Sequence, residues 1–431
     1  SSSAWALIMS YKIIQQQLDK SWRLFDSERI NFLCEVMTWL SHPDKDIRII
    51  QIAGTNGKGS TGAMLREIIL ASGETVGHFT SPAVFNDCEQ IWLNGNFVSQ
   101  EAWVTAYEDL NHQLTQHNLT IANLSYFEVW TIVALLIFRQ NKVTYAIIEA
   151  GLGGRDDATH MISYGDIVAY TEIGLDHQNI LGHNIESIAQ NKADLITGGT
   201  LVVSDLEQVP AVTKILKRTA KREGAHWFEQ HDTISIQSET VNGLCLVINQ
   251  QRYQLGLNGA FQRRNAAVVW QVLSALELRY QVSFNIAARQ KGLANSFMVG
   301  RMQVDRTNRL VWDGAHNIDA VRALLETVKV WQLSTRPILI LGVLSDKNYD
   351  DMLAYLLPVF SEIIAVTPDN PRALEAEDLA DTIKKLAPNM TVTPVASQEA
   401  LALAQQKQGK NQYIMITGSF YTLRSVGEHY A

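Results

Sequence analysis

A glycine-rich stretch, Gly54–Ser60, carries the strongest chemical signal in the sequence. Its glycines let backbone N–H groups close around phosphate oxygens, because no Cβ atom stands in the way. Lys58 would neutralise the β- and γ-phosphates of a nucleotide, and the Ser60 hydroxyl could ligate Mg²⁺. The spacing differs from that of the standard phosphate loop, since Gly59 separates the lysine from the serine. We therefore expect phosphates to contact Gly54, Thr55, Asn56, Gly57, Lys58, Gly59 and Ser60, with an ordinary turn as the alternative.

An acidic residue, Glu149, ends a second apolar run. A carboxylate at the carboxyl end of a buried strand points into the crevice where α/β folds bind ligands. Glu149 is thus placed to hold a Mg²⁺ ion, and an exposed loop acid is the alternative. His177 would be an unusual partner for such an ion because hard cations prefer oxygen, so its residue type alone favours a hydrogen-bonding core residue. The local sequence around Lys192, taken alone, is typical of a solvated lysine.

These residues need a fold that brings the ends of several strands together. The order of an apolar strand at 47–53, the glycine loop and a helical pattern through Met64–Leu70 is the start of a nucleotide-binding α/β unit. Two helical patterns precede it, between Met9 and Leu40. Further strands are predicted at Thr75–Phe79, Tyr145–Glu149 and Ile167–Thr171, and further helices at Glu101–Gln116 and Glu128–Gln140. Short alternating runs between Trp227 and Leu257, with Asn242-Gly243 as a hairpin turn, predict a small antiparallel patch.

After Asn295 the pattern of alternating strands and helices starts again, with strands at Leu310–Trp312, Pro337–Leu341, Ile363–Val366 and Tyr413–Thr417. A chain of 431 residues is also too long for one compact core. The predicted fold class is therefore α/β in two domains. We expect a P-loop-type ATPase domain with a mainly parallel sheet at 1–295, a short linker at 296–299, and a smaller Rossmann-like domain at 300–431.

The composition of the chain indicates which classes of partner are not expected. The 36 basic and 44 acidic residues give a net charge of −8, so we expect no nucleic-acid partner. The three cysteines are far apart and lack metal-ligand spacing, which favours reduced thiols in the cytoplasm. Apolar runs such as Ile132–Phe138 are too short to span a bilayer, so no membrane is expected. The residues before Met9 lack the pattern of a secretory signal and are left out of the predicted fold.

Two segments carry a resemblance to a known family. The loop Gly-Thr-Asn-Gly-Lys-Gly-Ser is similar to that of the Mur ligase superfamily. The segment Glu149–Thr159, Glu-Ala-Gly-Leu-Gly-Gly-Arg-Asp-Asp-Ala-Thr, resembles the folate branch of that superfamily, folylpolyglutamate synthase and dihydrofolate synthase. The resemblance implies a cytoplasmic, monomeric ligase that uses ATP and two Mg²⁺ ions. It would join L-glutamate to a folate or to dihydropteroate through an acyl phosphate.

The resemblance also implies roles for individual residues. Lys192 matches a lysine that CO₂ converts to a carbamate, which turns a cation into an anion near the metal. Arg301 would neutralise phosphate, and His316 would help align glutamate or the acyl phosphate. Because the glycine loop and His316 belong to different domains, we expect the domains to close on ligands. The metal ligands would be Ser60, Ser81, Glu149 and His177.

Nucleotide and substrate contacts follow in the same way. The family's adenine and ribose contacts match Asn265 and Asp313, although an N-terminal helix residue is the unaided interpretation of Asn265. Tyr126 and Phe127 could pack on a flat pterin, and the alternative is a helix start with Ser125 as its N-cap. Further substrate contacts would be Asp157, Ala158 and Ser419.

The chain departs from the family pattern at Gln90, His160, Asp194 and Ile318. Two alternatives therefore stay open. One is a cell-wall Mur ligase, which shares the glycine loop but does not explain Glu149–Thr159. The other is a regulator that binds nucleotide without turnover. The sequence also leaves open the choice between dihydropteroate and a folate, the preferred one-carbon form and the length of the glutamate chain.

Overall fold

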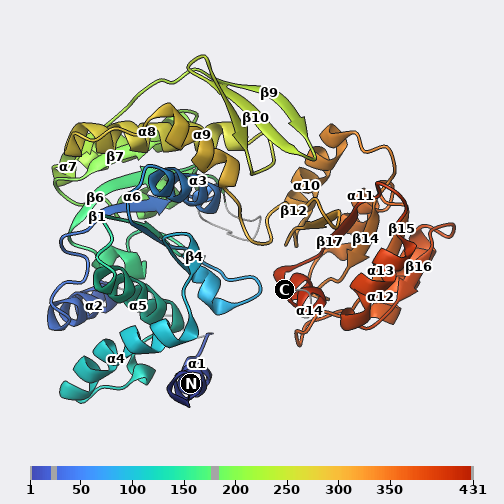
Figure 1. The fold of residues 1–431 in the computed structure, drawn as a ribbon, viewed down its shortest axis with the longest axis horizontal. Helices are drawn as coiled ribbons and strands as arrows, with labels where there is room; N and C mark the ends of the chain where they lie inside the picture. Colours follow the sequence, from blue (N-terminus) through green and yellow to red (C-terminus); the bar gives the residue numbers. More distant parts are fainter. Residues whose placement is uncertain (1, 21–26, 176–183, 429–431) are drawn as a thin grey trace.

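The computed structural model describes residues 2–20, 27–175 and 184–428. It has two lobes, a larger N-terminal domain and a smaller C-terminal domain (Figure 1). Each domain is built around a mainly parallel sheet, as predicted. Within the described residues, no helix combines the length and the apolar character that crossing a membrane would require.

Eight strands form the main sheet of the N-terminal domain, in the order β4-β3-β2-β5-β1-β6-β7-β8. Neighbours from β2 to β8 in this order are parallel, whereas β3 is antiparallel to both β2 and β4. The strands are β1 (Arg48–Ala53), β2 (Val76–Phe79), β3 (Ile91–Leu93), β4 (Asn96–Phe97), β5 (Tyr145–Glu149), β6 (Gly165–Tyr170), β7 (Leu201–Ser204) and β8 (His226–Trp227). The strands predicted at Tyr145–Glu149 and around 47–53, 75–79 and 167–171 are thus confirmed.

Both faces of this sheet are covered by helices (Figure 1). Successive side chains of β1 alternate between the faces: Ile49 belongs to the core formed with α1, α2, α4 and α5, whereas Ile50 belongs to the core formed with α3 and α8. The helices are α1 (Ser2–Gln17), α2 (Ser27–Trp39), α3 (Lys58–Ala71), α4 (Gln100–Gln116), α5 (Tyr126–Gln140), α6 (Ile185–Ala193), α7 (Pro210–Glu223), α8 (Gln262–Tyr280) and α9 (Ile286–Asn295), with short 3₁₀ helices at Asp87–Gln90, Ile121–Asn123 and Ala158–Met161.

The prediction that left the residues before Met9 out of the fold is wrong. Helix α1 begins at Ser2. It is held by its contact with α4, where the rings of Tyr11 and Trp103 meet edge to face with centroids 5.6 Å apart. The pattern of the segment alone does not show this partner, which lies about a hundred positions further along the chain.

The predicted antiparallel patch is a separate three-stranded sheet of β9 (Ile234–Thr240), β10 (Gly243–Ile248) and β11 (Gln251–Leu255). The β9–β10 turn contains Asn242, and Gly243 after it has a φ of 121° that favours glycine. This hairpin reaches from the N-terminal domain towards the C-terminal domain (Figure 1). There Arg306 donates to the Asn242 carbonyl over 2.6 Å.

The sheet of the C-terminal domain has the order β12-β13-β17-β14-β15-β16, and only β12 is antiparallel to its neighbour. Its strands are β12 (Gln303–Asp305), β13 (Leu310–Trp312), β14 (Ile338–Leu341), β15 (Glu362–Ala365), β16 (Val392–Pro394) and β17 (Ile414–Thr417). Its helices are α10 (Ile318–Trp331), α11 (Tyr349–Leu356), α12 (Ala376–Leu386), α13 (Ser397–Lys407) and α14 (Phe420–Gly427). Residues 296–299, predicted as the linker, lie between α9 and β12.

A loop of the N-terminal domain docks into the C-terminal domain. Val84 and Phe85, between β2 and β3, pack in the core formed by β13, β17 and α14. Arg424 of α14 donates to the Val84 carbonyl over 2.9 Å. The Glu89 carboxylate folds the loop by accepting hydrogen bonds from the N–H groups of residues 84, 85 and 86.

Candidate functional site

The predicted polar residues gather at one edge of the large sheet. Strands β2, β5, β1 and β6 are neighbours and run parallel, so their carboxyl ends lie at the same edge. Ser81 follows β2, Glu149 ends β5, and the glycine loop Gly54–Gly57 follows β1. This edge is the usual ligand crevice of such a sheet.

The glycine loop is anchored to the segment after β6. Thr55 exchanges hydrogen bonds of 3.0 Å with the backbone of Gly174 through its hydroxyl, and its N–H donates to the Glu172 carbonyl. Gly57 has a φ of 93°, and a Cβ on Gly54 would clash with Thr171. The loop is therefore fixed in a glycine-only conformation at the start of α3, where N–H groups and the helix dipole favour an anion.

Two lysines meet at this loop. Lys58 Nζ lies 3.2 Å from the Gly54 carbonyl oxygen and 3.4 Å from that of Gly151. Lys192, at the end of α6, directs its Nζ to the same Gly54 oxygen at 3.4 Å. Lys192 is 8% exposed, so the interpretation of this residue as a solvated lysine is wrong. The structure thus brings both lysines together at the glycine loop.

A chain of amides joins Ser60 to α8. Gln262 Nε2 donates to the Ser60 hydroxyl at 3.1 Å, and Gln262 Oε1 accepts from Asn265 Nδ2 at 3.0 Å. Asn265 packs so closely on Gly57 that a Cβ there would clash with it. Asn265 thus packs against the glycine loop at Gly57. Sequence reasoning gave Gln262 no role, although its spacing of three residues from Asn265 puts both on one face of the helix.

Met298 of the predicted linker covers the start of α3. Its sulfur lies 3.1 Å from the Ser60 hydroxyl, and a Cβ on Gly59 would clash with its methyl group. Because a thioether is not a Mg²⁺ ligand, a metal at Ser60 requires this side chain to move. Sequence analysis did not single out Met298, since an apolar linker residue carries no chemical signal.

Glu149 is 2% exposed and contacts His78, a residue of β2 that sequence analysis also missed. Its neighbourhood fits a hard cation. A Cβ on Gly59 would lie 4.0 Å from Glu149 Oε1, so this carboxylate oxygen lies towards the glycine loop, where the Met298 methyl group now packs. Among the described residues, no group of three His, Cys, Asp or Glu side chains could hold a metal. A hydroxyl and one carboxylate suit Mg²⁺, which is usually completed by waters and substrate phosphates.

The second glycine-rich segment is held by Asp157. Its Oδ1 accepts from the N–H groups of Gly151 and Leu152 at 2.8 Å and 3.1 Å, and its Oδ2 accepts from the N–H and hydroxyl of Thr159. Both carboxylate oxygens therefore shape the loop. Ala158 is buried in the 3₁₀ helix that Asp157 caps.

Two of the departures from the family pattern, His160 and Asp194, contact Arg155 of the same loop. His160 Nδ1 lies 2.7 Å from the Arg155 carbonyl oxygen. Asp194 accepts from Arg155 Nε at 2.6 Å, which ties the loop to the end of α6 beside Lys192. These two side chains thus stabilise the loop.

Tyr126 and Phe127 begin α5 next to this loop. Ser125 and Glu128 form a capping box, so the predicted N-cap is confirmed. Phe127 packs against Gly151, and the Tyr126 hydroxyl accepts from Gln90 Nε2 at 2.9 Å. Gln90, another departure, is therefore a buried partner of a predicted substrate contact.

The C-terminal domain presents its predicted residues near β13 and α14. Arg301 is exposed and lies 4.7 Å from the centre of the Phe420 ring. The Asp313 carboxylate accepts from the N–H groups of residues 302 and 315, both at 2.9 Å. His316 is half-buried, with Nδ1 3.3 Å from the Gly314 carbonyl oxygen. Ser419 is buried and caps α14.

The last departure, Ile318, is the first residue of α10. Asn317 caps this helix by accepting from the Ala320 N–H at 2.8 Å, so the turn forms without a proline. His177, predicted as a metal ligand, lies outside the described residues.

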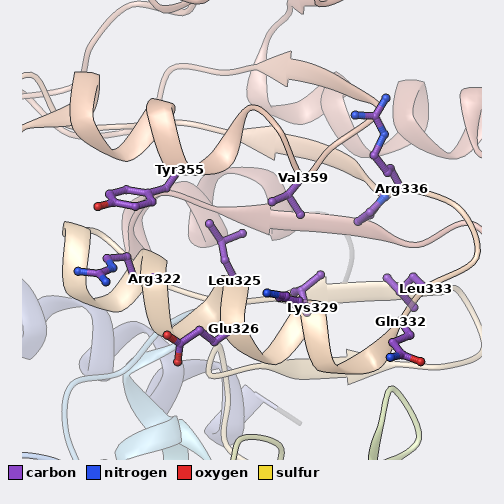
Figure 2. Close-up of a pocket in the computed structure, with 11 residues that line it drawn as sticks. Arg322, Leu325, Glu326, Lys329, Gln332, Leu333, Arg336, Tyr355 and Val359 are labelled. Atoms are coloured by element: carbon purple, nitrogen blue, oxygen red, sulfur yellow. The ribbon is translucent and has the colours of Figure 1, made fainter.

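A groove of about 480 Å³ lies elsewhere, between α10 and α11 of the C-terminal domain. Figure 2 shows the side chains that line it, among them Arg322, Lys329 and Tyr355. None of the predicted site residues belongs to it. The candidate active site is therefore the sheet edge around the glycine loop.

Comparisons with known proteins show which family the chain resembles. Residues 300–420 match the family described as Mur ligase, glutamate ligase domain. The chain is 33% identical to the dihydrofolate synthase/folylpolyglutamate synthase of Bacillus subtilis, over 91% of this chain and 92% of that protein.

Solved structures show the same similarity. A Mycobacterium tuberculosis folylpolyglutamate synthase complexed with ADP is 27% identical, with a TM-score of 0.81 and 99% of each chain covered. A bifunctional folylpolyglutamate synthase/dihydrofolate synthase from Yersinia pestis, complexed with AMPPNP and Mn ion, is 27% identical, with a TM-score of 0.76 and 98% of each chain covered. With a relative that is 33% identical over 91% of its length, the chain belongs to the folylpolyglutamate synthase/dihydrofolate synthase family.

Proposed function

We propose that this chain is an ATP-dependent ligase that joins L-glutamate to the carboxylate of a folate through an acyl phosphate. The observation that carries the proposal is the convergence of Lys58 and Lys192 on the Gly54 carbonyl, at the sheet edge where Glu149 ends the neighbouring strand. The Lys58 cation, a second lysine that CO₂ could convert to a carbamate and one buried carboxylate form a site suited to a metal-bound triphosphate. The similarity to folylpolyglutamate synthases supports the choice of substrates.

The reaction would run in two steps, because a free carboxylate is a poor acyl donor. A carboxylate oxygen attacks the γ-phosphorus of ATP, the bond to ADP breaks, and an acyl phosphate forms. The glutamate amine then attacks the acyl carbon, the bond to phosphate breaks, and the nitrogen loses a proton. Each amide bond would therefore consume one ATP and release ADP and phosphate.

The chain's own residues would position these groups and offset their charge. Lys58 and Arg301 would contact the phosphoryl group in transfer. Mg²⁺ would neutralise the phosphates, held by Ser60, Ser81 and Glu149, with His177 at a second ion. Lys192 as a carbamate would help orient this metal site.

Substrate contacts divide between the domains. Asn265 and Asp313 would contact the nucleoside, whereas His316 and Ser419 would face glutamate and the acyl phosphate. Tyr126, Phe127 and Ala158 would contact the pterin. Asp157 would act through the loop that it holds, because both its oxygens already accept hydrogen bonds from that loop.

The experiment is a ligation assay with the full chain, ATP, Mg²⁺ and ¹³C-labelled glutamate. The acceptors are dihydropteroate, tetrahydrofolate monoglutamate and a nucleotide-linked cell-wall peptide, and the readouts are phosphate release and product mass. We expect glutamate-dependent phosphate release and a product one glutamate heavier with at least one of the first two acceptors. No glutamate-dependent turnover with any acceptor would favour the regulator, and turnover with the cell-wall peptide alone would favour the cell-wall ligase.

We also propose that the enzyme works in the cytoplasm. All three cysteines, Cys34, Cys88 and Cys245, are free thiols. Two of them are buried, and burial raises the pKa of the Cys88 thiol to about 11. Free thiols are typical of proteins from reducing compartments.

A further inference from the structure

A buried histidine lies directly behind the predicted metal carboxylate. His78 on β2 is 1% exposed, and its Nε2 contacts Oε2 of Glu149 on the neighbouring strand β5. Neither the ligation chemistry above nor the predicted ligand set uses this residue. The position of the ring proton of His78 follows from its contact with Arg66.

Arg66 on α3 fixes the tautomer of His78. Its Nη1 lies 3.2 Å from His78 Nδ1. A guanidinium has donors only, so Nδ1 must accept and the ring proton must sit on Nε2. The Nε2–H group therefore donates to Glu149 Oε2. Burial lowers the pKa of Arg66 to about 10. This value is still above neutral pH, so the guanidinium stays charged.

Arg66 is itself held in place. Its guanidinium lies 4.7 Å from the centre of the Trp92 ring and 5.1 Å from that of Phe297, and its Nε lies 3.8 Å from Glu67 Oε1. These contacts leave the arginine little freedom. The orientation of His78 is thus set by a rigid neighbour.

Gly62 provides the space for this arrangement. A Cβ on Gly62 would lie 2.5 Å from His78 Nε2 and 3.0 Å from Glu149 Oε2. Glycine inside a helix is less favourable than alanine. A glycine in the middle of α3 is therefore consistent with a position where a larger residue would push His78 and Glu149 apart.

We propose that His78, held by Arg66, is a positioning residue that fixes the Glu149 carboxylate by its Oε2 atom and so presents Oε1 to a divalent cation at the nucleotide loop. Oε1 is the atom that lies towards Gly59. Partners behind a metal ligand orient it in this way and raise metal affinity. The inference rests on the proposed function only in assigning the cation to Glu149.

The first test measures Mn²⁺ binding, without folate or glutamate, by the electron paramagnetic resonance signal of free Mn²⁺ in the presence of ADP. The variant His78→Leu removes the donor and should weaken binding by about 10- to 100-fold. His78→Gln, whose amide can still donate, should recover most of that loss. His112→Gln, an exposed residue of α4, is the matched control and should bind Mn²⁺ as the unchanged protein does.

Catalysis gives a second readout. In the ligation assay, His78→Leu should raise the KM for Mg²⁺ by the factor seen for Mn²⁺, with kcat at saturating Mg²⁺ changed less than about threefold. Thermal unfolding of each variant separates this effect from a loss of folded protein. Metal affinity that is unchanged in folded His78→Leu would overturn the inference. Histidine-dependent Mn²⁺ binding without any ligation would support it while contradicting the proposed function.

A direct test needs no substitution in the measured protein. In the metal-free chain labelled with ¹⁵N-histidine, two-bond ¹H–¹⁵N spectra distinguish the ring tautomers, and His78→Gln identifies the resonance. We expect a neutral ring with its proton on Nε2. A proton on Nδ1 would contradict the proposal, because Arg66 could then not donate to that atom.

Discussion

Lys58 and Lys192 donate to the same acceptor, the carbonyl oxygen of Gly54, from distances of 3.2 Å and 3.4 Å. The two residues come from different helices, α3 and α6. The shared carbonyl therefore brings two ammonium groups together at the glycine loop. Substitutions of the two lysines test the same part of the proposed nucleotide site.

Replacing Lys58 by methionine should remove most of the activity without unfolding the protein. We expect kcat to fall by about 10²- to 10³-fold, as for the loss of one preorganised charge in a transition state. Unfolding in urea should show nearly unchanged stability, because methionine keeps the apolar stem of this half-buried side chain. Lys291→Met, an exposed lysine of α9, is the control. Activity within threefold of normal in Lys58→Met would remove the lysine from the mechanism.

Lys192 tests the carbamate. After incubation with ¹³C-bicarbonate, the unchanged protein should give a carbamate carbon resonance that Lys192→Arg lacks. Arginine keeps the positive charge but forms no such carbamate, so this variant should lose about 10²-fold in kcat if an anion is needed there. Full activity of Lys192→Arg would mean that a cation suffices at this position.

Met298 should oppose nucleotide binding. Its half-buried side chain touches Ser60 and must leave before a metal can bind there. Met298→Ala should therefore tighten the Kd of Mn²⁺–ADP by about fivefold, which corresponds to about 1 kcal/mol. Calorimetric titration measures this change, with the exposed Met9→Ala as control. Weaker binding would show instead that Met298 is part of the nucleotide site.

The ion pair between Arg29 and Glu128 should stabilise the start of α5. Arg29 contacts both carboxylate oxygens at 2.8 Å and 2.7 Å, and the side chains are 13% and 6% exposed. Arg29→Met should lower the free energy of unfolding by about 3 kcal/mol, since Glu128 is left buried without its cation.

The control for this prediction is Lys407→Met, which breaks a more exposed ion pair and should cost less than about 1 kcal/mol. Urea unfolding followed by circular dichroism compares the two variants. The folded Arg29→Met protein should also show a raised KM for the pterin acceptor, because Tyr126 and Phe127 begin the same helix. Equal losses of stability in both variants would contradict the argument.

The fold was predictable where packing against neighbouring strands and helices gives a segment a simple pattern of apolar and polar residues. A parallel strand is buried on both faces, so Tyr145–Glu149 is a continuous apolar run with an acid at its end. The convergence of Ser81, Glu149 and the glycine loop follows, because carboxyl ends of parallel strands share one edge. The predicted start of α5 at Glu128 was two residues late, because the Ser125 cap places it at Tyr126.

Features that depend on distant contacts were not predictable. Helix α1 starts at Ser2 because it has a partner in α4, and no local pattern indicates that partner. His78 lies within an apolar strand and looks like a core residue until β5 brings Glu149 beside it. A local hint was available in Gly62, a glycine in the middle of a strong helical pattern.

The docked loop around Val84 limits how the domains can move. The peptide chain joins them at residues 296–299, and Val84 and Phe85 join them again through the core that contains Leu423. A third contact joins Arg306 to the Asn242 carbonyl of the β9–β10 hairpin. Rotation of the C-terminal domain about the line through the linker and the docked loop would keep the first two attachments in place. Such a rotation, carrying Arg301 and His316 towards the phosphates, should therefore break the hydrogen bond between Arg306 and Asn242.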